Sequence, residues 1–238
     1  MPGIVTEEPT RRVRMPEHPL LGMPRRDVAV TVSLALATAV VFVLVAVPAS
    51  RVHVQAFDDG YLRRMLAIRS GPLTAIAKVL NVLGLTFVTL PIRLLIAGFL
   101  AVRRRWWHLG AFAGAIVLSE ILIGTLKGVF DRARPPGALV STSGASFPSG
   151  HAVAASVTAV AAVIALFPEG RKRFLWGAAA ALFALLMGLS RAYLAAHWFS
   201  DALAGVLLGT TCALVAALVV HAIRARRAAG RHRSGTEP

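Results

Sequence analysis

A short polar sequence stands directly before one of the long apolar runs of the chain, and its residue types suit phosphate. Pro148, Ser149, Gly150 and His151 precede the run 152–167. Serine is a favoured residue at a helix start, so this pattern predicts a helix that begins at Ser149 and Gly150. The first turn of a helix offers unpaired backbone N–H groups and the positive end of the helix dipole, which favour an anion such as phosphate. We expect His151 to lie beside the bound anion.

Other residues capable of this chemistry stand at the ends of three further apolar runs. They are Lys127 and Arg134 after the run 109–126, Arg191 after 174–189, and His197 with Asp201 before 202–223. If the apolar runs are helices that alternate up and down, all of these residues lie at the same end of the bundle as His151. Cations, a helix N-terminus and two histidines then meet in one place.

This set of groups fits phosphoryl transfer. Arginine, lysine and N–H donors stabilise the negative charge that spreads over the phosphoryl oxygens in the transition state. His197 and Asp201 are four positions apart and would share one face of a helix. We expect Asp201 to accept the Nδ1–H of His197, which leaves Nε2 free to attack phosphorus. His151 is then the general acid that protonates the leaving oxygen.

A metal site is the competing interpretation of the same side chains. His151, His197 and Asp201 include an i, i+4 pair, a spacing that also suits zinc. The neighbouring cations would repel a divalent ion, and the three residues include no second carboxylate. Phosphate chemistry without a metal is therefore the favoured interpretation.

Three motifs stand in a fixed order along the chain. They read Lys127-x6-Arg134-Pro135, Pro148-Ser149-Gly150-His151 and Ser190-Arg191-x5-His197-x3-Asp201. With every defining position filled, the sequence resembles the type 2 phosphatidic acid phosphatases, membrane lipid phosphatases related to vanadium haloperoxidases. The resemblance implies a covalent phosphohistidine on His197, with His151 as the acid and Asp201 as the group that orients the nucleophile. It also implies a phosphate site without a metal or an organic cofactor, made of Lys127, Arg134, Ser149, Gly150, His151 and Arg191.

The composition is that of an integral membrane protein. Hydrophobic residues make up 56% of the chain and charged residues 16%, compared with about 25% charged residues in soluble domains. The apolar residues gather in runs long enough to cross a bilayer. Six spans are predicted, at 28–47, 79–102, 109–126, 152–167, 174–189 and 202–223. We therefore expect an all-α, polytopic membrane protein with one six-helix domain over residues 27–223.

The basic residues set the predicted orientation. With six spans, both termini lie on one side together with the basic segments 103–105 and 171–173. Arginine and lysine favour the cytoplasmic side, so both termini are predicted to be cytoplasmic and the active site to lie at the outer face of the cell membrane. The tails 1–26 and 224–238 are predicted to be disordered. The segment 49–78 mixes apolar and charged residues, which indicates an amphipathic helix in the membrane interface, ended by Gly71-Pro72.

Charge and cysteine content narrow the remaining options. The net charge is +15, but the basic residues flank the apolar runs and the basic tails lack interleaved aromatic residues. Membrane lipids are therefore the expected partners, rather than nucleic acid. Cys212, the single cysteine, is expected in the core. Asp131 and Arg132 are interpreted as local ion partners.

The favoured function is hydrolysis of a lipid phosphate monoester or pyrophosphate, such as phosphatidic acid, phosphatidylglycerol phosphate or undecaprenyl diphosphate. Alternatives remain open. Glu120 and Arg93 fall within predicted spans, where charged residues are costly, and they would suit a transporter or channel. By default Arg93 snorkels toward the cytoplasmic side, and Glu120 either tethers the helix that carries Lys127 by pairing inward or remains protonated. A phosphotransferase with an acceptor other than water also fits, whereas the filled motif set argues against a catalytically silent lipid-binding relative.

Overall fold

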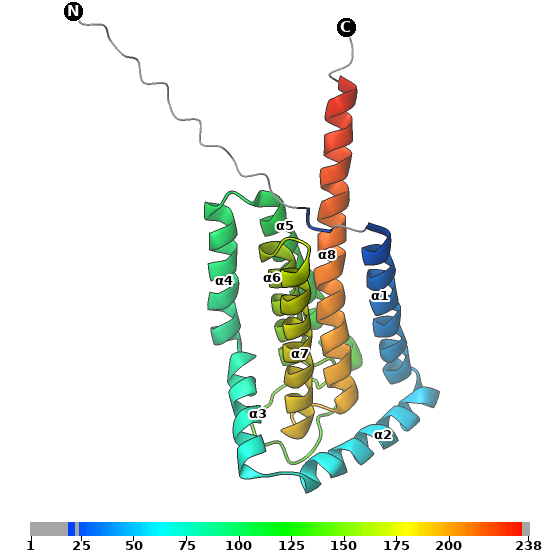
Figure 1. Cartoon of the computed structure of the whole chain (residues 1–238). Helices are drawn as coiled ribbons and strands as arrows, with labels where there is room; N and C mark the ends of the chain where they lie inside the picture. The colour runs from blue at the N-terminus through cyan, green and yellow to red at the C-terminus, as the bar shows by residue number, and fades with distance from the viewer. Residues whose placement is uncertain (1–18, 22–23, 235–238) are drawn as a thin grey trace, which may run out of the picture.

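The computed structural model describes residues 19–21 and 24–234, and these residues form helices and no strand. The helices are α1 (Pro24–Ala46), α2 (Pro48–Ala67), α3 (Gly71–Leu83), α4 (Thr86–Val102), α5 (Trp106–Phe130), α6 (Gly150–Leu166), α7 (Arg171–Tyr193) and α8 (Phe199–Ser234). The prediction of an all-α chain is confirmed. Most helices run roughly side by side, and α2 crosses beneath one end of the bundle (Figure 1).

The centre of the bundle is the pair α6 and α8, which make the most extensive helix–helix contact. Small residues permit this close approach. A Cβ added at Gly205 would lie 2.7 Å from the Ser149 carbonyl oxygen, and one added at Gly209 would lie 2.6 Å from the Val153 carbonyl oxygen. Cys212 lies in the main hydrophobic cluster with 1% of its surface exposed, so its predicted place in the core is confirmed.

The structure supports a multi-pass membrane protein. Among the described residues, four helices are long and apolar enough to cross a membrane: α1, α5, α7 and α8. The pair α3 and α4 passes the same test only when taken together, because the two helices meet at a bend of 52°. Helix α6 is apolar but only 17 residues long. Six full spans, and the side of the membrane that each end faces, therefore stay predictions.

Two predicted boundaries are wrong in the region 49–102. Helix α2 ends at Ala67, and Gly71-Pro72 begins α3 instead of ending the interfacial helix. A proline in the first turn of a helix is readily accepted, because its missing N–H would have no partner there. The predicted second span is interrupted between Leu83 and Thr86, whereas Pro91 lies inside α4 without ending it.

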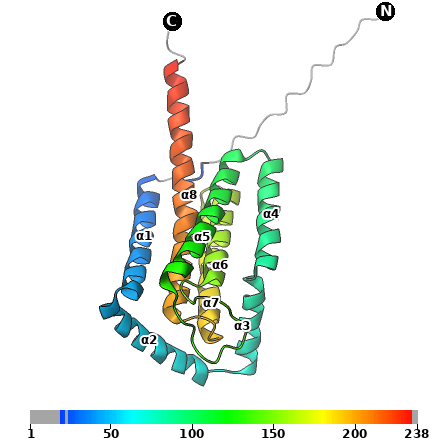
Figure 2. The same ribbon diagram turned by 180° about the vertical axis from the view of Figure 1, so that it is seen from behind.

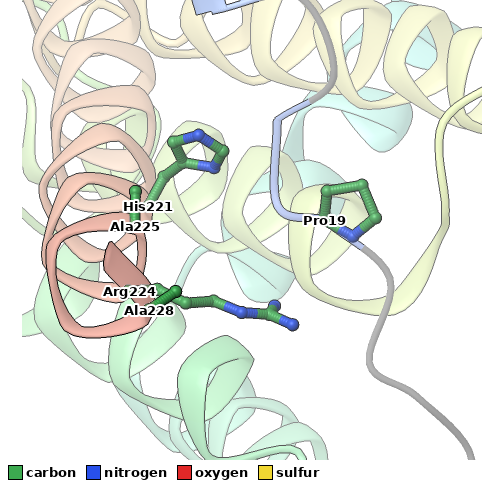
Figure 3. Close-up of a pocket in the computed structure, with 5 residues that line it drawn as sticks. All are labelled: Pro19, His221, Arg224, Ala225 and Ala228. Atoms are coloured by element: carbon green, nitrogen blue, oxygen red, sulfur yellow. The ribbon is translucent and has the colours of Figure 1, made fainter. Parts of the chain in front are cut away.

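The predicted disordered tails are also partly helical or buried. Leu20 and Leu21 are 1% and 3% exposed, and they pack in a cluster with Ala111, Ile164 and Ala217. Figure 3 shows the neighbouring Pro19 beside a pocket that is lined by α8 residues such as His221. Helix α8 continues to Ser234 through the basic sequence, since alanine and arginine are strong helix formers. The tail residues 1–18, 22–23 and 235–238 lie outside the described residues.

Candidate active site

The predicted site residues come from four helix ends that lie together. Helices α5 and α7 end, and α6 and α8 begin, at the end of the bundle crossed by α2 (Figures 1 and 2). The opposite end holds the start of α1 and the end of α8. The segment 131–149, which connects α5 to α6, folds back on this end, because the Ser146 N–H donates to the Arg132 carbonyl and the Ser149 N–H to the Asp201 carbonyl.

His197 is buried in the short connection between α7 and α8, with 3% of its surface exposed. Its Nδ1 lies 2.7 Å from the carbonyl oxygen of Ser146, so Nδ1 carries the proton and Nε2 carries the lone pair. The Nε2 atom is 3.2 Å from Nη1 of Arg134. Burial lowers the pKa of His197 to about 4, although the nearby Asp201 carboxylate opposes this effect. The ring is therefore neutral near pH 7, as a nucleophile must be.

Asp201 does not make the predicted bond to His197. Its Oδ2 atom is 3.8 Å from Nδ1 of His197, beyond hydrogen-bond distance. The i, i+4 argument fails because α8 begins only at Phe199, so His197 precedes the helix. Asp201 Oδ2 instead accepts bonds from Ser146 Oγ at 2.5 Å and from the Trp198 backbone N–H at 2.9 Å. The carboxylate thus acts on the histidine through Ser146, whose carbonyl holds Nδ1.

Arg134 and Lys127 bind the same turn beside His197. The Nε and Nη2 atoms of Arg134 donate to the carbonyl oxygens of Gly144 and Ser143 at 2.9 and 2.7 Å. Lys127 Nζ donates to the Ala145 carbonyl at 2.9 Å. Both cations are only partly buried. Burial also lowers the pKa of Arg134, yet not enough to discharge a guanidinium at neutral pH.

Three other predicted phosphate ligands have buried polar atoms that lack hydrogen-bond partners. These atoms are Ser149 Oγ, His151 Nε2 and Arg191 Nε. Ser149 stands before the first residue of α6 as predicted, but its side chain makes no capping bond. His151 interacts electrostatically with Arg191, His197 and Arg134, so these groups face a common space. Unpaired buried polar groups are destabilising, and an oxyanion bound there would supply their missing acceptors.

A buried ion network that the sequence did not reveal lies behind His197. Arg132 is 4% exposed, and its ion partners are distant in the sequence rather than local. Its Nη1 donates to Asp201 Oδ1 at 2.6 Å and to Ser200 Oγ at 2.7 Å. Its Nη2 donates to Asp58 Oδ2 at 2.8 Å and to Gln55 Oε1 at 2.7 Å. The predicted interfacial helix α2 is thereby bonded directly to the residues that position His197.

Asp58 completes this network from α2. It is 1% exposed and accepts the Ser200 backbone N–H at 2.9 Å and the Ser200 hydroxyl at 2.5 Å. Nothing in its sequence spacing distinguishes it from the exposed charges of the same helix. Asp131, which precedes Arg132 in the sequence, is exposed and adopts a left-handed conformation at the end of α5.

The intramembrane charges Glu120 and Arg93 form an ion pair with each other. Arg93 Nη1 lies 2.8 Å from Glu120 Oε1, and Arg93 Nε donates to Thr158 Oγ1 at 2.9 Å. This pair connects α4 with α5 and α6, so Glu120 tethers the helix that carries Lys127 by pairing with α4. Each charge has a partner, which accounts for both residues structurally.

Within the described part of the chain, no group of three or more histidine, cysteine, aspartate or glutamate side chains is arranged to hold a metal ion. His151, His197 and Asp201 therefore do not form the alternative zinc site there. Asp201 is already bonded to Arg132 and Ser146. The donor set of the site is instead rich in cations and N–H groups, which suits an anion.

Comparisons with known proteins identify the family of the chain. The model of the PAP2 superfamily matches residues 108–225, which span α5 to α8. The chain belongs to this superfamily of type 2 phosphatidic acid phosphatases. Among its relatives, phosphatidylglycerophosphatase B of Bacillus subtilis (strain 168) is 30% identical over 177 residues, which cover 71% of this chain and 87% of that protein.

Two solved structures share the fold. The crystal structure of a transmembrane PAP2-type phosphatidylglycerolphosphate phosphatase from Bacillus subtilis matches with a TM-score of 0.68 and 25% identity, over 82% of this chain and 96% of that chain. The crystal structure of LpxE from Aquifex aeolicus matches with a TM-score of 0.55 and 25% identity, over 65% and 91%. The family resemblance seen in the motifs is thus confirmed by sequence and by fold.

Proposed function

We propose that this protein hydrolyses a membrane lipid phosphate through a covalent phosphohistidine on His197. The observation that carries the proposal is that Ser149, His151 and Arg191 have buried polar atoms without hydrogen-bond partners, and that His151 interacts electrostatically with both Arg191 and the neutral His197. A tetrahedral oxyanion is the ligand that such a set of donors fits best. The cations Lys127 and Arg134 add charge at the more open side of the same space.

In the first step, Nε2 of His197 attacks phosphorus. A P–N bond forms, and the bond from phosphorus to the lipid oxygen breaks. The leaving oxygen takes a proton from His151, which becomes an imidazolium only when the anionic phosphate binds beside it and favours the charged form. Arg134 exchanges its contact with Nε2 for a phosphoryl oxygen, so the lone pair becomes available only when phosphate is present.

In the second step, water attacks the phosphorus of the phosphohistidine. Neutral His151 accepts the proton of the attacking water, the P–N bond breaks, and inorganic phosphate leaves. The Nδ1–H of His197 keeps its bond to the Ser146 carbonyl throughout, which stabilises the positive charge of the phospho-imidazole ring. Asp201 holds Ser146 in place for both steps. No metal or organic cofactor takes part.

The substrate is a phosphate monoester or pyrophosphate whose apolar chains stay in the bilayer. The name of the Bacillus subtilis relative makes phosphatidylglycerol phosphate the first candidate to test. Phosphatidic acid and undecaprenyl diphosphate carry the same reacting group. We further propose that the site faces outward at the cell membrane and that both termini are cytoplasmic, because basic residues gather at the opposite end of the bundle.

The test is phosphate release from these three lipids by the purified protein in detergent. We expect turnover of at least one lipid, insensitivity to a chelator, and inhibition by orthovanadate, a mimic of five-coordinate phosphorus. His197→Ala should lower the rate by about 10³-fold or more and His151→Ala by about 10²–10⁴-fold. His221→Ala, the matched control, changes a histidine at the far end of α8 and should leave the rate unchanged (Figure 3).

Trapping the intermediate separates this mechanism from others. Brief reaction with a ³²P-labelled lipid phosphate, followed by denaturation, should leave acid-labile label on the wild-type protein and none on His197→Ala. Loss of turnover in the presence of a chelator, restored by zinc, would contradict the proposed metal-free reaction. Uptake of solute into sealed vesicles without phosphate release would favour a transporter instead.

A further inference from the structure

Helix α3 contributes a wall of the site from outside the region that the family model matches. The family model begins at residue 108, whereas α3 covers Gly71–Leu83 and packs against α7. In both views of the ribbon α3 lies beside the end of the bundle that carries the site (Figures 1 and 2). Asn81, the single asparagine of the chain, stands in the last turn of this helix.

Asn81 contacts both a phosphate-binding cation and the proposed acid. Its side-chain Oδ1 accepts a hydrogen bond from Nη1 of Arg191, which is only 2% exposed. Its backbone carbonyl accepts a hydrogen bond from the ring of His151. The atoms left without partners are Nε of Arg191 and Nε2 of His151. One residue of α3 thus holds two side chains and leaves one polar atom of each for the oxyanion.

The bend after α3 brings the backbone itself against the acid. A Cβ added at Gly84 would lie 2.5 Å from Cδ2 and 3.1 Å from Cγ of His151, and 3.2 Å from Cε of Met187. Met187 is fully buried, so it has little room to move away. Glycine is needed here for space, since its φ of −88° is open to any residue. The chain at Gly84 therefore fixes one side of the His151 ring.

We propose that Asn81 is a positioning residue that aims Arg191 and His151 at the transferred phosphoryl group, an inference that rests on the proposed function. An amide oxygen holds a guanidinium by one hydrogen bond without neutralising its charge. A carboxylate at the same place would form an ion pair and compete with the phosphate. The neutrality of Asn81 keeps the full charge of Arg191 available to the substrate.

The variant Asn81→Asp tests this idea, because it keeps the shape and the acceptor and adds only a negative charge. We expect orthovanadate to bind at least about tenfold more weakly, measured by calorimetry, and the KM for the lipid phosphate to rise by a similar factor. The melting temperature in detergent should not fall, since the packing is unchanged. A purely structural role predicts the reverse: a lower melting temperature with unchanged vanadate affinity and KM.

A second pair of variants tests the contact at Gly84. Gly84→Ala should lower kcat about tenfold or more by displacing the His151 ring, while Gly98→Ala, on the open face of α4, should not change it. Equal kcat in these two variants, or unchanged vanadate affinity in Asn81→Asp, overturns the inference. Failure of the proposed function gives a different result, because the wild type would then release no phosphate from any lipid. The role of Asn81 can still be judged in that case, since the measurement of vanadate affinity needs no turnover.

Discussion

Replacing Arg132 by methionine would remove the cation that lies between two buried carboxylates. Asp58 and Asp201 are 1% and 0% exposed, and they lie 2.8 and 2.6 Å from the Arg132 guanidinium. Methionine is similar in length and apolar, so the packing of the arginine stem is largely kept. What changes is that both carboxylates lose their positive partner while staying out of contact with water.

The expected loss of stability is large. Leaving a buried charge without its partner destabilises a protein by about 3–5 kcal/mol. For a chain of this size, about 1 kcal/mol corresponds to roughly 2–4 °C in melting temperature, so Arg132→Met should melt roughly 6–20 °C lower. Asp58→Asn should have a smaller effect of about 1–2 kcal/mol, because Arg132 keeps its bonds to Asp201 and Ser200.

The assay is thermal unfolding of the purified protein in one detergent at one pH. In the double variant Arg132→Met/Asp58→Asn a single buried carboxylate lacks a partner, so its loss should be smaller than the sum of the two single losses. Asp59→Asn is the matched control, since it changes the neighbouring carboxylate, whose bond is to Gln55 Nε2 at 2.8 Å. It should melt within about 2 °C of the wild type.

The result that refutes this reasoning is an Arg132→Met protein that melts like the Asp59→Asn control. Additive losses in the double variant would show that Arg132 and Asp58 do not act as one unit. Phosphate release provides a second readout: the network holds Asp201, Asp201 holds Ser146, and the Ser146 carbonyl holds His197. Arg132→Met should therefore lose more activity than its folded fraction explains.

Two further predictions concern the nucleophile and the central helix pair. Because burial lowers the pKa of His197 to about 4, its ring should stay neutral from pH 7 to pH 5 and titrate near 4; an NMR signal that disappears in His197→Ala and titrates near 6.5 would contradict this. In the unfolded chain His197 has the ordinary histidine pKa of 6.5, so between pH 6.5 and pH 4 only the unfolded chain takes up the proton. This group therefore makes the unfolding free energy fall as the pH is lowered through that range. Gly209→Ala should lower the melting temperature, because its Cβ would overlap Ser156 Oγ and crowd the Val153 carbonyl, whereas Gly124→Ala, which meets nothing within 4 Å, should not; equal melting temperatures for the two would show that α6 and α8 can separate without loss.

Sequence predicted the residues of the site better than their contacts. The three motifs mark side chains that the up-and-down order of helices brings to one end, and the structure gathers them there. The contact between Asp201 and His197 was predicted from helical spacing, and it fails because α8 starts two residues after the histidine. A boundary that differs by a few residues is enough to redirect a hydrogen bond.

The partners contributed by α2 and α3 could not be predicted because they are far in sequence from the residues they contact. Asp58 lies 74 positions from Arg132, and Asn81 lies 110 positions from Arg191. Neither belongs to a motif, and in sequence Asp58 looks like Asp59 beside it. Their roles depend on how the N-terminal helices pack across the end of the bundle, which hydrophobic patterns do not specify. A buried polar residue among charged neighbours has no distinguishing spacing of its own.

The position of α2 also changes what this helix can do. As a loosely held interfacial segment it would be a cap that moves with the lipid. Its Asp58, however, is bonded to Ser200 and Arg132 in a region closed to water, and separating these charges would be costly. Because Ser200 and Asp201 open the helix that follows His197, displacing α2 would also displace the nucleophile. The bonds of Asp58 therefore indicate that α2 is held firmly against the start of α8 rather than free to move as a cap.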